Sequence, residues 1–213
     1  MWDLNLLRVD DAATIAAPEL ARDADALQSA LAFRNIEVGD AAVARRLGPG
    51  LQELGYRRTE LAVMARPTTG LPEALGVAVA EAGLETVAPL RDAWLRSDPV
   101  TADPATLAAV AASDRLIAAR VPTRVLCARV DGAPASYCLL LAGGQIDDVF
   151  TLPEHRGRGL ATAVLGAALR AAAAEGETGV FLLADADGRA RELYERLGFT
   201  AVGSLWSFLR LIA

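Results

Sequence analysis

The chain has 213 residues, 53% of them hydrophobic, and a formal net charge of −6 at pH 7. This length allows one large domain or two small ones, and an acidic balance without a basic tail argues against nucleic-acid binding. No apolar run approaches the roughly 20 residues of a membrane span, and the opening MWDLNLLRVDD is too acidic for a secretory signal. We therefore expect a soluble, cytoplasmic protein that binds neither nucleic acid nor membrane.

The first seventy residues have the pattern of a small α/β region. Residues 18–33 and 41–56 predict helices, whereas residues 34–38 and 59–65 alternate as strands. The segment RPTTGLP at residues 66–72 is rich in Pro, Thr and Gly and separates two patterned regions. We place a domain boundary there, which gives predicted domains at residues 1–70 and 71–213.

The second region contains more elements, and their order is informative. The predicted elements are a strand at 75–81, helices at 84–96 and 103–119, strands at 123–130, 135–142 and 145–152, a helix at 160–176, a buried strand at 179–184, a helix at 190–197 and two closing strands between 199 and 212. Asp131 and Gly132 predict a hairpin turn, and Asp103 with Pro104 predicts a helix start. This order predicts an α+β fold with a mixed, mostly antiparallel sheet flanked by helices.

The segment PEHRGRGLA at residues 153–161 interleaves two glycines with two arginines just before a predicted helix. A nucleoside-triphosphate loop would need a lysine after its last glycine, and none follows Gly159. A dinucleotide fingerprint would need its third glycine at Thr162 and a parallel unit around it. Backbone N–H groups at a helix start, with Arg156 and Arg158 nearby, favour a diphosphate site instead. An ordinary tight turn with a helix N-cap is the alternative.

A family resemblance rests on two motifs. Residues 156–161 (RGRGLA) match the R/Q-x-x-G-x-G/A signature of the GCN5-related N-acetyltransferases, and residues 190–199 (ARELYERLGF) resemble the A-x-x-L-Y-x-x-x-G-F that ends their acetyl-CoA site. The predicted element order from about residue 75 also resembles that fold. The resemblance implies acetyl-CoA as co-substrate, no metal, and a small-molecule or peptide amine as acceptor. The cofactor-binding residues that it implies are Val149, Phe150, Thr151, Arg156, Gly157, Arg158, Gly159, Leu160, Ala161, Thr162 and Asp187. Family members usually carry Asn at the last position, and aspartate accepts hydrogen bonds there but cannot donate as the amide does.

The same resemblance implies catalytic roles. Tyr194 would protonate the leaving thiolate, and an apolar aromatic on a helix face is the alternative interpretation. Some family members place a catalytic Glu where this chain has Leu182. The candidate bases are therefore Asp148, Asp147, Glu154 or a chain of water molecules, and at most one of two adjacent strand residues should point to the substrate. An acyl-CoA-binding pseudoenzyme or sensor is the rival function.

The remaining motifs and single residues of the chain predict smaller features. Residues 45–50 (RRLGPG) repeat the loop letters inside a predicted helix, so we do not expect a second cofactor loop there. Residues 1–70 resemble a degenerate copy of the same fold, with a dimerisation element as the alternative, and the protein is expected to be a monomer or a homodimer. His155 is expected to be a solvated loop side chain, and Cys127 and Cys138 are expected to be reduced core residues.

Overall fold

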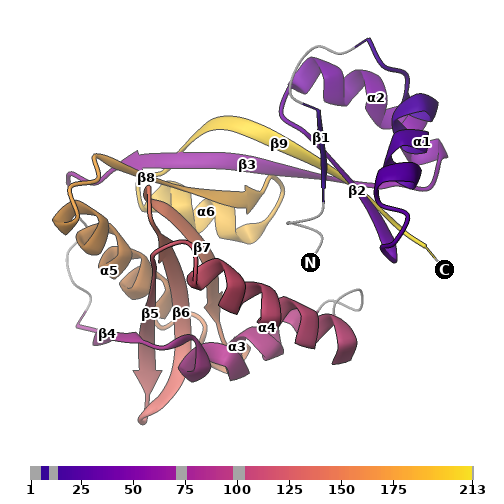
Figure 1. Ribbon diagram of the computed structural model, residues 1–213. Coiled ribbons are helices and arrows are strands. Elements are labelled where there is room, and N and C mark those ends of the chain that lie inside the picture. The colour runs from indigo at the N-terminus through magenta and orange to yellow at the C-terminus, as the bar shows by residue number, and fades with distance from the viewer. Residues whose placement is uncertain (1–5, 10–13, 71–75, 98–103, 213) are drawn as a thin grey trace. The chain divides into compact units, whose positions relative to one another are not determined.

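A computed structural model describes residues 6–9, 14–70, 76–97 and 104–212. The chain forms two compact units: unit 1 combines the residues up to Met64 with Leu183–Glu192 and the residues from Ala201 onward, and unit 2 combines Ala65–Leu182 with Leu193–Thr200. The elements, shown in Figure 1, are β1 (Leu7–Val9), α1 (Ala17–Leu27), β2 (Phe33–Val38), α2 (Ala41–Glu53), β3 (Arg57–Pro67), β4 (Val79–Ala82), α3 (Leu84–Arg96), α4 (Pro104–Ala118), β5 (Thr123–Val130), β6 (Ala133–Leu141), β7 (Gln145–Thr151), a 3-10 turn (Pro153–His155), α5 (Leu160–Ala174), β8 (Gly179–Asp185), α6 (Arg189–Arg196) and β9 (Thr200–Leu211).

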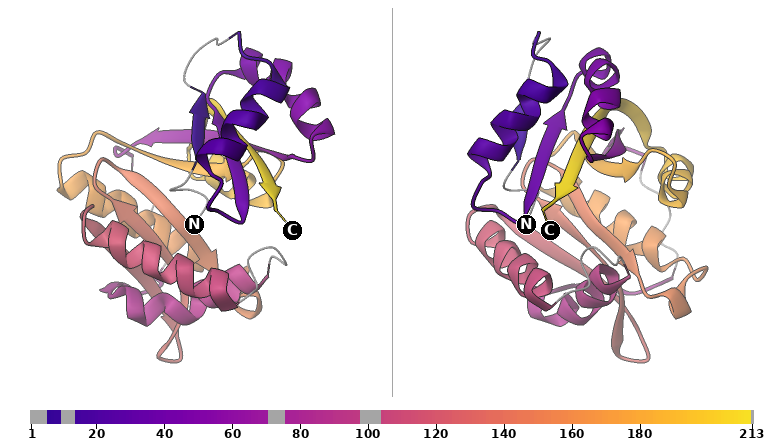
Figure 2. Two further views of the ribbon diagram at one scale, coloured as in Figure 1. Left: turned by 45° about the vertical axis from the view of Figure 1, so that its right-hand side comes forward. Right: turned by 90° about the vertical axis from the view of Figure 1, so that its right-hand side faces the viewer.

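Unit 1 is built around three neighbouring strands in the order β1-β2-β9, with β3 beside β9. Helices α1 and α2 cover this sheet, as the two views of Figure 2 show. Their apolar residues share one core with β2 and β9, whose buried side chains include Ile36, Leu47, Leu51, Trp206 and Phe208. Residues 45–50 lie inside α2, so the repeated loop letters form no loop, as the sequence predicted.

The composition of unit 1 differs from the predicted domain of residues 1–70. Strand β9 comes from the far end of the chain, and it pairs antiparallel with β2 from Phe33 opposite Leu211 to Val38 opposite Trp206. Because Trp206 and Phe208 are buried beside Ile36, the C-terminal strand is part of the core of unit 1. The contact between β2 and β9 places the C-terminal strand in unit 1. The composition of residues 66–72 could not indicate this pairing.

Unit 2 contains an antiparallel meander in the order β4-β5-β6-β7. One face packs against α3 through a cluster that includes Val87, Leu90, Cys127, Tyr137 and Phe150. The other face packs against α5, where the Cys138 thiol donates to the carbonyl of Val164 at 3.5 Å. Figures 1 and 2 show α3 and α5 on opposite sides of this sheet. Both cysteines are buried and reduced, as predicted, and they face opposite sides because Cys127 pairs with Tyr137.

Two predicted strand features are wrong. Instead of two closing strands, β9 is a single strand from Thr200 to Leu211, and Gly203 lies within it because strands β2 and β3 flank β9 and keep the chain extended. Strand β8 was expected to be buried on both faces. Its residues alternate instead: Val180, Leu182 and Ala184 are buried while Leu183 is 41% exposed. A continuous apolar run does not require burial of both faces, since much of the surface of a folded protein is apolar.

Strand β4 begins at Val79, within the predicted range of residues 75–81, and Leu75 lies outside the described residues. Helix α4 begins at Pro104, and Asp103 of the predicted cap also lies outside them.

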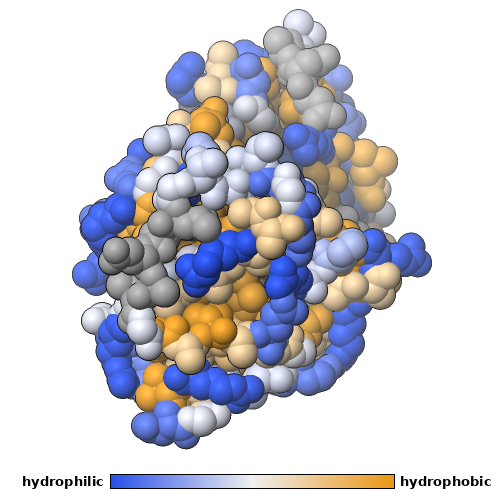
Figure 3. Space-filling model, turned by 90° about the vertical axis from the view of Figure 1, so that its left-hand side faces the viewer, coloured by the Kyte–Doolittle hydropathy of each residue, from blue (hydrophilic) through white to orange (hydrophobic). Residues whose placement is uncertain are grey.

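The surface of the described segments carries scattered apolar side chains. Figure 3 shows one face, on which hydrophobic areas are interrupted by hydrophilic side chains. The described helices include none that is long and apolar enough to cross a membrane.

Candidate active site

The glycine loop joins β7 to α5 through a left-handed backbone. Gly157 and Gly159 have φ angles of +73° and +78°, values that side chains with a Cβ rarely adopt. Gly159 is the N-cap of α5 and offers no side chain to cap it. The N–H groups of the first helical turn, which begins at Leu160, therefore point to the loop without partners from within the helix. Such a turn suits an anion.

The two loop arginines are exposed and held by local contacts. Arg156 donates from Nε to the Thr151 carbonyl at 3.2 Å, which ties the loop to the end of β7. A guanidinium nitrogen of Arg158 lies 3.2 Å from Nδ1 of His155. His155 is half-buried, so it is less solvated than expected, and it contacts a residue of the loop. Both guanidinium groups thus add positive charge at the start of α5.

Strands β7 and β8 pair only at their beginnings. Within the described residues, their parallel ladder consists of Gln145 opposite Phe181, and the Phe181 N–H donates to the Gly144 carbonyl at 3.0 Å. On its other side β7 continues to pair with β6, where Phe150 stands opposite Tyr137 and Thr151 opposite Ser136. The ladder between β7 and β8 therefore ends before Val149. An extended ligand could hydrogen-bond to this edge of β7 at Val149 and beyond.

Tyr194 is the buried residue of α6, and its ring centroid lies 5.9 Å from that of Phe199. Burial raises the pKa of Tyr194 to about 12, and the nearby Cys138 and Asp147 side chains act in the same direction. The phenol therefore keeps its proton at neutral pH. A protonated hydroxyl can act as a hydrogen donor to a developing anion.

Asp147 and Asp148 lie at an irregularity of β7. The register with β6 passes from Phe150 opposite Tyr137 to Asp147 opposite Leu139, so Asp148 and Val149 both face the single residue Cys138, as in a β-bulge. The backbone of Asp148 is left-handed, with φ at +53°. The expectation that neighbouring residues alternate between faces assumed a regular strand, and it does not hold here. Asp147 is exposed and accepts a hydrogen bond from the Asp148 N–H at 2.9 Å.

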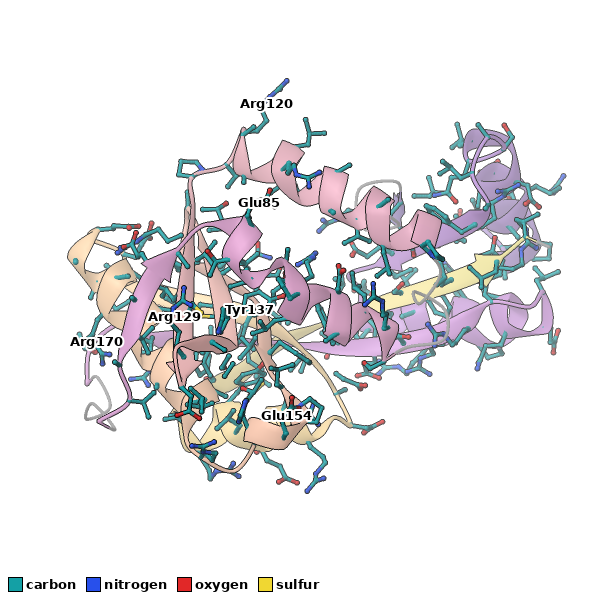
Figure 4. All side chains as sticks on the ribbon, turned by 90° about the horizontal axis from the view of Figure 1, so that it is seen from below. Glu85, Arg120, Arg129, Tyr137, Glu154 and Arg170 are labelled. Atoms are coloured by element: carbon teal, nitrogen blue, oxygen red, sulfur yellow. The ribbon has the colours of Figure 1, made fainter. Side chains whose placement is uncertain are left out.

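The Asp148 carboxylate is buried in unit 2. Its side chain is 7% exposed and forms an ion pair with Arg91 of α3. Both residues line a pocket between α3, α4 and the sheet, together with Leu84, Glu85, Arg115 and Tyr137. Figure 4 shows Glu85 near the start of α3, Tyr137 on the sheet beneath, and Glu154 apart from them near the turn after β7.

Sequence reasoning missed Arg91 and Tyr137. A signal for Arg91 was present, because it occupies a position of the apolar stripe that runs through Leu84, Val87 and Trp94 at helical spacing. An arginine on a buried stripe indicates a buried ion pair. Tyr137 lacked any such signal, since an aromatic residue in a strand is ordinary core.

The remaining predicted positions are less central. Asp187 belongs to unit 1, is exposed, and its N–H donates to Oδ1 of Asp185 at 3.2 Å. Leu182 is buried and offers no acid. Among the described residues, no group of three or more His, Cys, Asp and Glu side chains converges as metal ligands would.

Comparison with solved structures shows the fold. A functionally unknown conserved protein from Staphylococcus epidermidis superposes with a TM-score of 0.67 at 16% identity, over 92% of this chain and 81% of that one. A GCN5-related N-acetyltransferase from Sphaerobacter thermophilus has a TM-score of 0.61 at 20% identity, over 91% of this chain and 65% of that one. A GCN5-related N-acetyltransferase from Kribbella flavida has a TM-score of 0.58 at 19% identity, over 95% and 80%. These likenesses support the predicted mixed sheet flanked by helices.

Sequence comparison identifies the family. A search of curated proteins finds no match. The acetyltransferase (GNAT) family matches residues 88–199, which is more than half of the chain and includes both the glycine loop and Tyr194. The protein belongs to the acetyltransferase (GNAT) family.

Proposed function

We propose that the protein transfers an acetyl group from acetyl-CoA to a primary amine. The observation that carries this proposal is the left-handed glycine loop at the start of α5. This loop follows strand β7, which pairs with β8 at its first residue and then diverges from it. The family supports acyl transfer in general. The choice of acetyl-CoA and of an amine acceptor is our proposal.

The residues present fit the two polar parts of CoA. The diphosphate would lie against the N–H groups of residues 157–162, with Arg156 and Arg158 contributing charge. The amide-containing arm would pair with the edge of β7 at Val149, Phe150 and Thr151, as an added strand does. A side chain at Gly157 or Gly159 would strain this backbone, because both φ angles are positive.

The chemistry that acetyl-CoA supplies is a thioester with a good leaving group. The amine nitrogen attacks the carbonyl carbon, the new C–N bond forms, and the C–S bond breaks. A backbone N–H of β7 stabilises the negative charge that develops on the carbonyl oxygen. Tyr194 gives its proton to the sulfur and regains one from solvent, while the proton of the amine passes to water or to a carboxylate.

The test follows free thiol while the purified protein is incubated with acetyl-CoA and a panel of amines, amino acids and peptides. We expect thiol release with at least one class of amine and a loss of roughly 100-fold or more in kcat for Tyr194→Phe, the range of a general acid. Retained kcat in Tyr194→Phe would remove the acid role of Tyr194 and leave the loop assignment intact.

Acetyl-CoA binding, measured by calorimetry, tests the loop separately. Gly159→Glu should weaken binding by about tenfold or more, because it adds strain and a negative charge at the diphosphate site. Gly132→Glu is the matched control, since Gly132 is also left-handed, with φ at +82°, but lies in the turn between β5 and β6. Unchanged binding in Gly159→Glu would show that the loop does not hold the cofactor. Binding without thiol release across the whole panel would favour an acyl-CoA sensor.

A further inference from the structure

We propose, on the basis of the proposed function, that Arg91 is a positioning residue: through Asp148 it holds the β7 bulge in the left-handed conformation that sets the acyl site. Asp148 would then serve as a backbone anchor and not as the base that the sequence suggested. The proposal concerns one ion pair between α3 and β7, and both partners lie in unit 2.

The bulge needs something to hold it. Asp148 is one of two described residues other than glycine with a positive φ, and the other, Asp131, sits in the hairpin turn next to Gly132. A left-handed residue within a strand is disfavoured relative to extended backbone, and aspartate is among the side chains that tolerate it best. Such a conformation persists where surrounding contacts fix it.

Helix α3 supplies those contacts on both sides of Val149. Arg91 pairs with the Asp148 carboxylate, and the two side chains are 19% and 7% exposed. The Arg91 guanidinium also lies 6.0 Å from the ring centroid of Trp94, and that ring is 6.4 Å from the ring of Phe150. The residues before and after Val149 are therefore both contacted from α3, one by charge and one by ring packing.

This arrangement connects the pocket to the strand edge. Arg91, Asp148 and Tyr137 line the pocket beside α3, whereas Val149 lies in the stretch of β7 that follows its ladder with β8. The backbone dihedral angles of Asp148 together set where the N–H of Val149 points, because that N–H lies in the peptide plane that joins the two residues. A carboxylate that is buried against a guanidinium is poorly placed to take a proton from an incoming amine.

A substitution series at Asp148 separates an anchor from a base. Asparagine tolerates left-handed backbone and can accept from Arg91, glycine tolerates the backbone alone, and alanine does neither. An anchor role predicts kcat near the wild-type value for Asp148→Asn, an intermediate kcat for Asp148→Gly, and the lowest for Asp148→Ala. The loss for alanine should be roughly five- to thirtyfold, which corresponds to about 1–2 kcal/mol. A base role predicts the same large loss in all three variants, and that result would overturn the proposal.

A double substitution tests Arg91. Arg91→Met leaves the Asp148 carboxylate buried without its cation, so kcat should fall while the KM for the amine changes little, and Arg91→Lys should recover part of the loss. Arg91→Met combined with Asp148→Asn should recover kcat, because the neutral amide needs no cation. If Arg91 binds the acceptor instead, Arg91→Met raises the KM for the amine and the second substitution restores nothing.

Amide hydrogen exchange of residues 148–151 provides a readout that needs no turnover. Exchange should be fast in Arg91→Met and Asp148→Ala and close to wild type in Asp148→Asn and in the double variant. If the wild-type protein acetylates no amine, the proposed function fails, and the exchange pattern still decides the positioning role. Equal exchange in all these variants would show that the ion pair does not hold the bulge.

Discussion

The candidate role of Tyr194 can be predicted from the sequence, whereas its burial is visible only in the fold. The letters ARELYERLGF were enough to name it as a candidate acid. Its surroundings come from distant segments: Cys138 lies on β6 and Asp147 on β7. The local sequence could not show the burial that raises the pKa of the phenol, because that burial depends on the packing of α6.

The raised pKa of Tyr194 predicts a specific alkaline weakness. The unfolded tyrosine ionises near its ordinary pKa of 10.0, while the folded one keeps its proton until about 12. Between these values the unfolded state binds fewer protons, so the free energy of unfolding falls as the pH rises. Tyr194→Phe should lack this contribution, and the difference in slope amounts to about 1 kcal/mol per pH unit at pH 11.

Urea titrations followed by circular dichroism at pH 8 and pH 11 measure this slope. Cys138→Ala is the control, because burial also raises the pKa of the Cys138 thiol and its ionisation must be separated from that of Tyr194. Equal losses of stability in wild type and Tyr194→Phe between the two pH values would show that the phenol ionises at its ordinary pKa.

At the scale of elements, the sequence predicted strands and helices whose signals are local. The hairpin between β5 and β6 is an example, since Asp131 and Gly132 adopt φ angles of +50° and +82° as a tight turn of these residue types requires. The bulge at Asp148 was missed because its cause is the register with β6 and a contact from α3. The single strand β9 was missed for a similar reason, since its neighbouring strands keep it extended past Gly203.

Arg66 stabilises the end of α6 from a position that the sequence assigned to a linker. Its guanidinium donates to the Leu197 carbonyl and to those of Thr69 and Gly70, at 3.1 and 2.9 Å, and the residue is 9% exposed. Arg66→Met should lower the free energy of unfolding by about 3 kcal/mol, because three part-buried hydrogen bonds from a charged donor are lost.

Thermal and urea unfolding check the role of Arg66. Arg58→Met is the matched control, since Arg58 also lies on β3 but pairs with Glu60 at the surface. Its cost should stay within about 0.5 kcal/mol. A similar decrease in the free energy of unfolding for the two substitutions would mean that water solvates the carbonyls of Leu197 and Gly70 well enough without Arg66.

At the scale of the whole molecule, residues 71–213 were predicted as a domain and residues 1–70 as a separate region. That the first region is a degenerate copy of the family fold stays a proposal. The compact units cut across the proposed boundary, because Trp206 and Phe208 of β9 belong to the core that Ile36, Leu47 and Leu51 complete. Local patterns could place a linker, but a strand contributed by the opposite end of the chain leaves no mark in linker composition.

A chain of residues 71–213 alone should therefore fold incompletely. Without β2 and the helices that pack on it, β9 loses its partner from residue 206 to 211, and Trp206 and Phe208 lose the core in which they are 5% and 0% exposed. Burying two aromatic side chains contributes several kcal/mol, which is a large part of the stability of a small domain, so the fragment should bind a hydrophobic dye and unfold without a sharp transition.

Amide exchange of β9 should be fast in the fragment and slow in the full chain, whereas the hairpin of β5 and β6, which lies entirely within unit 2, should stay protected in both. A fragment that protects β9 as well as the full chain does would show that residues 71–213 fold independently. It would also show that the first seventy residues are an addition to a complete domain rather than the partner of its last strand.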